Sequence, residues 1–564
     1  MSPENNTIHR RAPFMKVLAL FLFIVAATMA CFAPTLYNEL LNYDDAGYIV
    51  NNEHIRSLSF ETVRWAFAEF YNNYWAPLTW ISLALDYSLW GLNPVGYHLT
   101  NNLLHALNAG MFFLLVLQLL RNYRTALIRE GSDSALFVDQ HALYCALLAA
   151  LHFALHPLRV ESVAWATERK DVLGLFFGLP AVIFYLRAAE RPSGSAGERD
   201  RGPALLTSPA YWWSVAFFAL SLLSKSLLVT LPMLLLIMDW FPLKRIHRRN
   251  LQWRLFEKVP FLVLAGLVSG ITATAVAPVV KSLQEIGIVT RLLIAGKAIA
   301  AYLWLTVFPL QVSPAYLHPG NLSGIQAEHL ISILVLAAIT AFCFSRLKHR
   351  PLYMAVWLMY VITLLPVLGL IQTGPQAMAG RFTYAAGMFI SVLVALGFTA
   401  IYARIVRSRA LVVLLCSAAL CMLLGNSYIT VRDISWWKDD VTLWTRSIVL
   451  QPNVIGRLYF NRSLAYKARG DYPKALADLD EAYAIATRKG YKGAHEILAE
   501  RGRVYQHGGD LNKALAEFSL AIEASKYPDD RMYHWERGAV YQALGMTDLA
   551  NDDFKQASVD KRGP

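Results

Sequence analysis

The sequence predicts an all-α protein, in which a polytopic helical membrane domain is followed by a solenoid of helical repeats. Of the 564 residues, 56% are hydrophobic and only 16% are charged, and the mean hydropathy is +0.37. The apolar residues occur in runs close to the ~20 residues that span a bilayer. After Gly425 the composition becomes that of a soluble protein, and three segments share the spacing of a helical repeat.

The charge distribution indicates a membrane protein. The net charge of +12 would suit a nucleic-acid-binding protein, but the basic residues cluster in short loops between apolar runs, as orientation in a membrane requires. We therefore exclude nucleic acid as a partner. The five cysteines lie in or beside apolar runs without metal-like spacing, so they predict neither disulfides nor zinc. The basic loops lie at 9–11, 121–129, 187–201, 244–249, 346–350 and 404–409.

Placing all six basic loops in the cytoplasm predicts about eleven spans, with the amino terminus inside and the carboxy terminus outside. The spans are 14–36, 97–120, 140–156, 172–187, 210–224, 227–241, 258–277, 329–345, 352–371, 385–403 and 410–428. Segment 292–310 is also apolar, but counting it would put the 346–350 loop outside. We therefore expect an interfacial or re-entrant helix there. The predicted domains are 1–428, in the membrane, and 429–564, the repeats.

The tail contains a repeat that can be aligned on Gly470, Gly509 and Gly545. Five columns recur, and small residues in them let two helices approach closely while Tyr and bulky residues fill the layer between repeats. This is the tetratricopeptide pattern, whose period is ~34 residues. We expect a half repeat beginning near Asp440 and about three full repeats. The columns are Ser463/Gly502/Gly538, Tyr466/Tyr505/Tyr541, Ala475/Ala514/Ala550, Leu479/Phe518/Phe554 and Ala482/Ala521/Ala557.

An acidic pair, Asp44-Asp45, follows the first predicted span in LNYDDAGYIVNN. Carboxylates beside lipid are costly, so we interpret the pair as functional. Two adjacent carboxylates repel, and one can then hold its proton more tightly, which suits a general base. A divalent cation held by the same two residues is a second option. The alternative interpretation is that the pair lies in a solvated turn and has no functional role.

A polar stripe occupies the start of the second span. His98, Asn102 and His105 recur every three or four residues in YHLTNNLLHALNA, so they share one helix face. The sequence leaves two interpretations open for them, direct contact with substrate and hydrogen bonding between helices.

The outer loop HPLRVESVAWATERKDV is rich in charge. Basic residues on an outer face run against the positive-inside bias, so we expect an anionic ligand near them. Mutual salt bridging, with Asp171 capping the next span, is the alternative. The candidate residues are His156, Arg159, Glu161, Glu168, Arg169 and Lys170.

Two further cations stand at the outer ends of otherwise uncharged spans. They are Lys225 in SKSLLVTLP and Arg381 in AGRFTY, the latter followed by Tyr384. A phosphate oxygen is a natural partner for such cations, and snorkelling is the alternative for Lys225. Carboxylates in one outer loop and cations in three others suit a lipid-phosphate-linked donor that is attacked by an acceptor from the outer compartment.

These motifs resemble the transmembrane-and-tetratricopeptide-repeat glycosyltransferases, relatives of the protein O-mannosyltransferases of the GT-C superfamily. The resemblance rests on YDDAGYIVNN, YHLTNNLLHALNA, HPLRVESVAWATERKDVLGLFF and SKSLLVTLPMLLLIMDWFPL, and it covers nearly the whole chain. It implies a GT-C-type membrane domain and a polyprenyl- or dolichyl-phosphate sugar donor, with mannose the usual sugar. It implies transfer to protein hydroxyls with inversion and a catalytic role for Asp44 and Asp45. Members usually carry an acidic residue before the late Arg, where this chain has Gly380.

We therefore expect a membrane glycosyltransferase that acts on the luminal or periplasmic face. Asp44 or Asp45 would be the base. The repeats would dock an acceptor protein, and the short array favours a bacterial inner membrane. Transfer to a glycan or lipid is the alternative within enzymes, and a non-catalytic membrane-anchored repeat scaffold is the alternative of another class. The residues expected to hold the donor phosphate are Arg159, Arg169, Lys170, Lys225 and Arg381.

Overall fold

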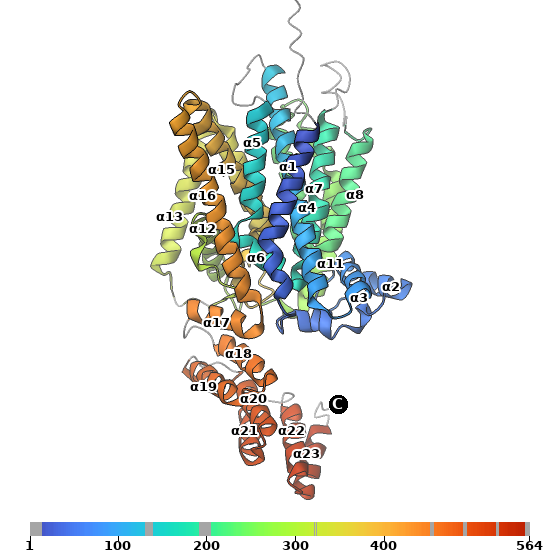
Figure 1. Ribbon diagram of the computed structural model, residues 1–564. Coiled ribbons are helices and arrows are strands. Elements are labelled where there is room, and N and C mark those ends of the chain that lie inside the picture. Colours follow the sequence, from blue (N-terminus) through green and yellow to red (C-terminus); the bar gives the residue numbers. More distant parts are fainter. Residues whose placement is uncertain are drawn as a thin grey trace, which may run out of the picture. The chain divides into compact units, whose positions relative to one another are not determined.

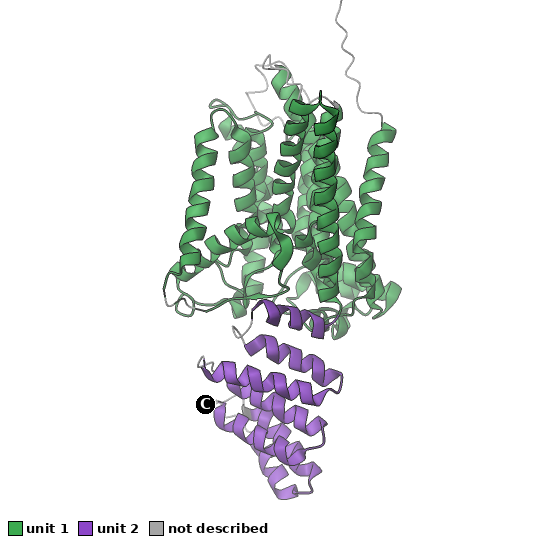
Figure 2. Ribbon diagram, turned by 60° about the vertical axis from the view of Figure 1, so that its left-hand side comes forward, with its two compact units in different colours: residues 1–438 green, residues 439–564 purple. Residues whose placement is uncertain are grey.

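The computed structural model describes residues 14–129, 139–190, 205–320, 322, 324–451, 456–488, 493–525 and 530–558. The chain divides into two compact units, residues 1–438 and 439–564 (Figure 2). The predicted basic segments at 9–11 and 191–201 lie outside the described residues.

The first unit is built from long apolar helices that run side by side (Figure 1). Helix α4 packs against α1, α5 and α7, while α7 packs against α8 and α15 packs against α5 and α14. Prolines begin α3, α4, α8 and α14, where the missing N–H has no helical partner. The helices are α1 (Phe14–Phe32), α2 (Phe60–Ala68), α3 (Pro77–Trp90), α4 (Pro94–Arg129), α5 (Asp139–Ala154), α6 (Val160–Ala164), α7 (Arg169–Glu190), α8 (Pro209–Ser224), α9 (Leu231–Trp240), α10 (Leu251–Phe256), α11 (Val259–Val276), α12 (Ile288–Val307), α13 (Ala327–Arg346), α14 (Pro351–Leu364), α15 (Thr383–Ile405) and α16 (Arg409–Ile434).

Short elements connect these helices at the end of the unit where α1 finishes. They include 3₁₀ turns at Ala33–Tyr37, Pro157–Arg159, Ala166–Glu168, Ser226–Thr230 and Gly380–Phe382, and a single π turn at Ala46–Val50. Strands β1 (Tyr316–Leu317) and β2 (Gln376–Met378) pair antiparallel, with Tyr316 opposite Met378. We call this end, which carries Asp44 and the segments around 160 and 380, the site end. The opposite end, which carries the basic loops, is the basic end.

The all-α membrane architecture is confirmed. Among the described residues, eight helices are long and apolar enough to cross a membrane, and a bent pair, Gln140–Ala154 with Pro157–Ala164, would be a ninth. Three shorter apolar helices, Pro209–Ser224, Ser226–Trp240 and Pro351–Val367, complete the set. Seven of the eight, the bent pair and the three shorter helices correspond to the eleven predicted spans. The additional helix is α12.

Helix α12 contacts connections at the site end both near its start and near its end. Near its start the hydroxyl of Thr290 accepts the Leu322 N–H at 3.4 Å. Near its end the hydroxyl of Tyr302 accepts the Ala379 N–H at 2.9 Å, and the Thr306 carbonyl lies 3.0 Å from His156 Nε2. The segments around 322, 379 and 156 are all connections at the site end, so these contacts favour the predicted interfacial or re-entrant helix.

The second unit is a series of helical hairpins. Helix α17 (Asp440–Leu450) precedes α18 (Gly456–Ala468), α19 (Tyr472–Arg488), α20 (Ala494–His507), α21 (Leu511–Ala524), α22 (Asp530–Ala543) and α23 (Thr547–Ser558). The aligned glycines Gly470, Gly509 and Gly545 have φ of +75°, +84° and +76°. They end the first helix of each hairpin in the left-handed conformation, which glycine adopts without strain. The tetratricopeptide assignment remains a prediction from the repeat pattern.

The orientation of the first unit in the membrane can be tested in intact spheroplasts. A protease added from outside should remove unit 2, because α16 runs from the basic end to the site end and the chain continues from there. A cysteine introduced by Lys348→Cys should stay unlabelled by an impermeant maleimide. Labelling at 348 together with protection of unit 2 would mean that α12 crosses the membrane.

Candidate active site

The two carboxylates of the acidic pair have different surroundings. Asp45 is fully buried, and its carboxylate accepts the N–H groups of Leu41 and Thr167, each at 2.9 Å, and the Thr167 hydroxyl. Burial raises the pKa of Asp45 to about 7, against the effect of these donors, which favour the carboxylate. Asp44 is partly exposed, and its carboxylate makes no hydrogen bond or ion pair with another described residue. Asp45 therefore links two loops, and Asp44 is available for chemistry.

Three of the predicted cations meet around one buried carboxylate, Glu168. Lys225 lies 3.2 Å from it, and Lys170 and Arg381 lie 3.3 Å from it. Lys225 also pairs with Asp171 at 2.5 Å. We call Lys170, Lys225 and Arg381 the cation cluster. Because they come from three separate segments, only the folded chain brings them together.

Glu161 fixes Arg381 a second time. Its carboxylate pairs with the Arg381 guanidinium and accepts the Arg381 N–H at 3.1 Å. A Cβ added at Gly380 would lie 3.0 Å from Glu161 Oε2, so this carboxylate occupies the space next to Gly380. Glu161 thus places an acidic group beside Gly380, the sequence position at which the resembled family usually carries one.

Aromatic rings surround the cation cluster. The ring of Tyr43 stacks on Trp165 at 4.7 Å and 8°, and the Arg381 guanidinium lies 5.4 Å from the centre of Trp165. The Lys170 ammonium lies 5.0 Å from Tyr48 and 5.3 Å from Tyr74. Such rings attract a cation through their electron-rich faces and exclude water from it.

Gln376 connects the acidic pair to the cation cluster. Its side-chain nitrogen donates to the Tyr43 hydroxyl at 2.6 Å, and its oxygen accepts from Arg381 at 3.2 Å. Tyr43 is the neighbour of Asp44 in the chain. The carboxylate of the first loop and the cations of the later loops therefore belong to one connected site.

Tyr74, Trp165 and Gln376 were not predicted from the sequence. Tyr74 reaches the site because Asn72 and Asn73 form a tight turn with φ of +50° and +58°, a conformation that Asn tolerates well. The Asn-Asn pair between two Tyr residues was the available signal for this turn. We see no comparable signal for Gln376.

Two predicted phosphate ligands, Arg159 and Arg169, make their hydrogen bonds away from the cation cluster. Arg159 donates to the carbonyls of Thr383 and Tyr384, both at 2.7 Å. Arg169 is completely buried and pairs with Asp86 at 2.6 Å. The contacts of Arg159 hold the start of α15, and the ion pair of Arg169 joins α7 to α3. The geometry therefore favours a structural role for both residues.

The polar stripe serves packing between helices. Asn102 donates to the Phe32 carbonyl at 3.1 Å, and His105 lies 2.8 Å from the Tyr384 hydroxyl and 3.0 Å from the Ala154 carbonyl. His98 is buried on α4. The contacts of Asn102 and His105, together with that of His156 to α12, favour interhelical hydrogen bonding, one of the two interpretations that the sequence left open.

An apolar cavity of about 550 Å³ begins one helical turn from the cation cluster. Leu175, Leu228 and Ala385 line it, and they follow Asp171, Lys225 and Arg381 by three or four residues. The lining continues along α15 as far as Ala400, fifteen residues further on, or about 22 Å at 1.5 Å per residue. The cavity thus follows the helices through most of a ~30 Å hydrocarbon core.

The described residues include no group of three or more His, Cys, Asp or Glu side chains that could hold a metal ion. The oxygens of Asp45 face N–H and O–H donors, which leaves Asp44 as the one carboxylate of the pair free to act as a ligand. The acidic pair therefore does not form a divalent-cation site by itself.

We predict that the contribution of Asp45 to the free energy of unfolding depends on pH. Its pKa in the folded protein is raised to about 7 from an ordinary value of 3.8. Protonation of Asp45 therefore stabilises the folded protein, fully below pH ~4, and this stabilisation is lost as the pH rises through 7. The difference in Tm between wild type and Asp45→Asn should shrink from pH 5 to pH 8, as measured by thermal unfolding in detergent. A pH-independent difference would contradict the assignment.

No protein-family model matches this chain. Its curated relatives include the protein O-mannosyl-transferases TMTC2 of Mus musculus, 30% identical over 29% of this chain and 18% of that protein, and TMTC4 of Mus musculus, 26% identical over 36% and 27%. Tmtc3 of Drosophila melanogaster is 24% identical over 83% of this chain and 55% of that protein. The chain thus spans about half or less of the length of these relatives.

Among solved structures, the chain matches ArnT from Cupriavidus metallidurans bound to undecaprenyl phosphate. That match has 13% sequence identity and a TM-score of 0.35, and it covers 90% of this chain and 81% of that one. The resemblance inferred from the motifs is confirmed by the curated relatives, which are protein O-mannosyl-transferases.

Proposed function

We propose that the chain is a membrane glycosyltransferase. It moves a sugar, with mannose the expected one, from a polyprenyl-phosphate-linked donor to Ser or Thr hydroxyls of proteins. The observation that carries this proposal is that Gln376 connects Tyr43, the neighbour of Asp44, to a cation cluster, and that the lining of a long apolar cavity starts one helical turn along the chain from that cluster. The names of the curated relatives support the choice of mannose and of a protein acceptor.

The donor has two chemically different ends, and the site has a place for each. The phosphodiester lies against Lys170, Lys225 and Arg381, whose side chains are only about a tenth exposed. The isoprenoid chain enters the apolar cavity, whose lining starts one turn away from those same cations. Burial of the cations strengthens their attraction for the phosphate, because water screens them little.

The transfer is a single displacement. The acceptor hydroxyl attacks the anomeric carbon and passes its proton to Asp44, while the bond from that carbon to the phosphate oxygen breaks. The electron pair leaves with the lipid phosphate, whose charge becomes more negative, and the cation cluster stabilises it. Attack opposite the leaving phosphate inverts the configuration at the anomeric carbon.

The remaining charged residues position the reacting groups. Asp45 ties the Asp44 loop to Thr167, next to Glu168, and so sets the distance between base and cations. Glu161 and Glu168 hold the cation side chains in place before the donor binds. Arg159 and Arg169 keep the supporting helices together.

The second unit supplies the acceptor surface in this proposal. Its helical hairpins, read as a half repeat and about three tetratricopeptide repeats, dock the acceptor protein on the side where transfer takes place. We place the chain in a bacterial inner membrane, with the site end and the repeats in the periplasm, because the basic loops lie at the other end.

The roles of the two aspartates can be separated by mutation. Asp44→Asn should lower turnover ~10²–10⁴-fold with an unchanged Tm, since it removes the general base alone. Asp45→Asn should lower the Tm as well, because Asn keeps only one acceptor oxygen and either Leu41 or Thr167 loses its partner. The assay uses purified protein, polyprenyl-phosphate mannose and a Ser/Thr-containing acceptor protein. Near-normal turnover in Asp44→Asn would remove the proposed function.

The lipid cavity can be tested by filling it. Gly397 lines the cavity, and a Cβ added there meets no atom within 4 Å, so the side chain of Gly397→Leu starts in open space. We expect the KM for a long-chain donor to rise at least several-fold, with little change for a donor of short prenyl chain.

The matched control is Gly425→Leu on α16, where an added Cβ also meets nothing but which does not line the cavity. The control should leave both KM values unchanged. An equal rise for long and short donors in Gly397→Leu would show that the isoprenoid chain binds elsewhere.

A further inference from the structure

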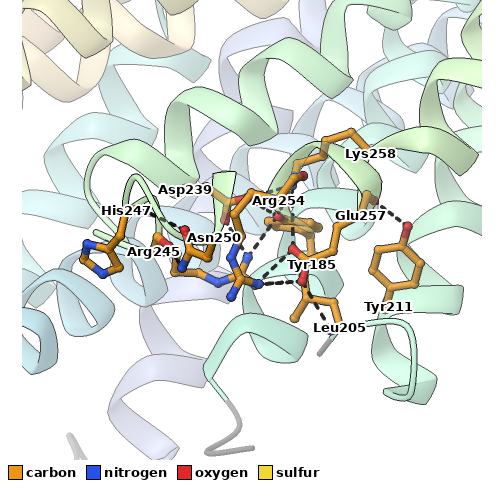
Figure 3. A network of polar contacts seen from close by, with 10 residues as sticks. All are labelled: Tyr185, Leu205, Tyr211, Asp239, Arg245, His247, Asn250, Arg254, Glu257 and Lys258. Atoms are coloured by element: carbon orange, nitrogen blue, oxygen red, sulfur yellow. Dashed lines mark hydrogen bonds and ion pairs between the residues drawn. The ribbon is translucent and has the colours of Figure 1, made fainter. Parts of the chain in front are cut away.

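Figure 3 shows a second charged network, which lies at the basic end of the first unit. It includes Tyr185, fourteen residues along α7 from Asp171, which is about 21 Å. Asp239 accepts from Tyr185, Arg245 and Lys258, each at 2.6 Å. Glu257 pairs with Arg254 at 2.5 Å and with Arg245 at 3.1 Å. Three cations and two carboxylates leave one net positive charge.

This network holds the loop between α9 and α10 in one conformation. The Arg245 N–H donates to the Asp239 carbonyl at 2.7 Å, and the Asn250 side chain donates to the Arg245 carbonyl at 3.0 Å. The Asn250 side-chain oxygen accepts the His247 N–H at 2.8 Å. The tip of the loop, Arg248 and Arg249, is exposed, and neither side chain pairs with another described residue.

Helix α10 and the residues after it have an inverted pattern of burial. The charged side chains of Arg254, Glu257 and Lys258 are buried against the unit, whereas Leu255 and Phe256 are 47% and 50% exposed. A helix that faces water shows the opposite arrangement. The outer face of this segment therefore contacts an apolar medium, which in a membrane protein is the acyl chains.

The depth of α10 matches the boundary of the bilayer. The Tyr211 hydroxyl donates to the Glu257 carbonyl at 2.6 Å, which ties α10 to the start of α8. The next two residues, Trp212 and Trp213, are 51% and 58% exposed. Exposed Trp residues at the end of a membrane helix mark the headgroup region.

We propose that this loop and the outer face of α10 bind an anionic phospholipid of the leaflet at the basic end. The phosphate lies against Arg248 and Arg249, and the acyl chains cover Leu255 and Phe256. The guanidinium groups alone would attract any anion, but only a lipid also uses the adjacent apolar face. The proposal does not depend on the transferase function.

The experiment uses the purified full-length chain in a neutral detergent. Phosphatidylglycerol should raise the Tm, and native mass spectrometry should show a retained lipid. The double substitution Arg248→Gln and Arg249→Gln should weaken phosphatidylglycerol binding about 30-fold. Each basic residue near an anionic membrane surface contributes about 1 kcal/mol, and the loss of two such contributions corresponds to this factor. Phosphatidylcholine, inorganic phosphate and glycerol phosphate should raise the Tm of wild type little.

The matched control is Arg407→Gln with Arg409→Gln, which removes the same charge from another exposed basic loop at this end. The control should bind phosphatidylglycerol as wild type does. An equal loss in the control would show a general effect of charge, and equal stabilisation by inorganic phosphate would show that no lipid is required. Either result, or the absence of any shift in wild type, overturns the proposal.

Discussion

The site end depends on the burial of one carboxylate. A carboxylate removed from water is unstable unless cations and hydrogen bonds replace its hydration. Glu168 is 1% exposed and lies within 3.3 Å of three cations from different segments. Removing it would leave three buried cations with less compensation, so the same interaction both assembles the fold locally and keeps the cations together.

The acidic pair extends this principle to the first loop. Asp45 contributes its two oxygens to Leu41 and Thr167 and thereby orders the loop on which Asp44 stands. Because Thr167 directly precedes Glu168, the base and the cations share one backbone anchor. In the proposed mechanism, two neighbouring residues of the same type thus have different roles, Asp45 in positioning and Asp44 in chemistry, and their side chains alone do not reveal this difference.

The fold class was predictable because it rests on local properties, namely apolar runs of membrane length and a repeated set of small and bulky residues. The residue types of the site were also predictable, since charges are rare in such segments. Which cations belong to the site was not, because that depends on tertiary pairing. Arg169 is matched by Asp86, 83 residues earlier in the chain. Asp86 was itself a signal, as the single carboxylate in an apolar helix.

Both ends of the membrane unit bury charged side chains, but they arrange them differently, and the difference favours an enzyme over a scaffold. At the basic end Asp239 and Glu257 bind cations that brace a loop, and the apolar residues around them face outward. At the site end Glu161, Glu168 and Asp171 bind the cations, and the lining of an apolar cavity starts one helical turn along the chain from these residues. Asp44 makes no hydrogen bond or ion pair there with another described residue. A scaffold needs only the first arrangement. Buried cations close to a carboxylate and to a long apolar cavity are what the proposed transfer from a lipid-linked phosphate requires.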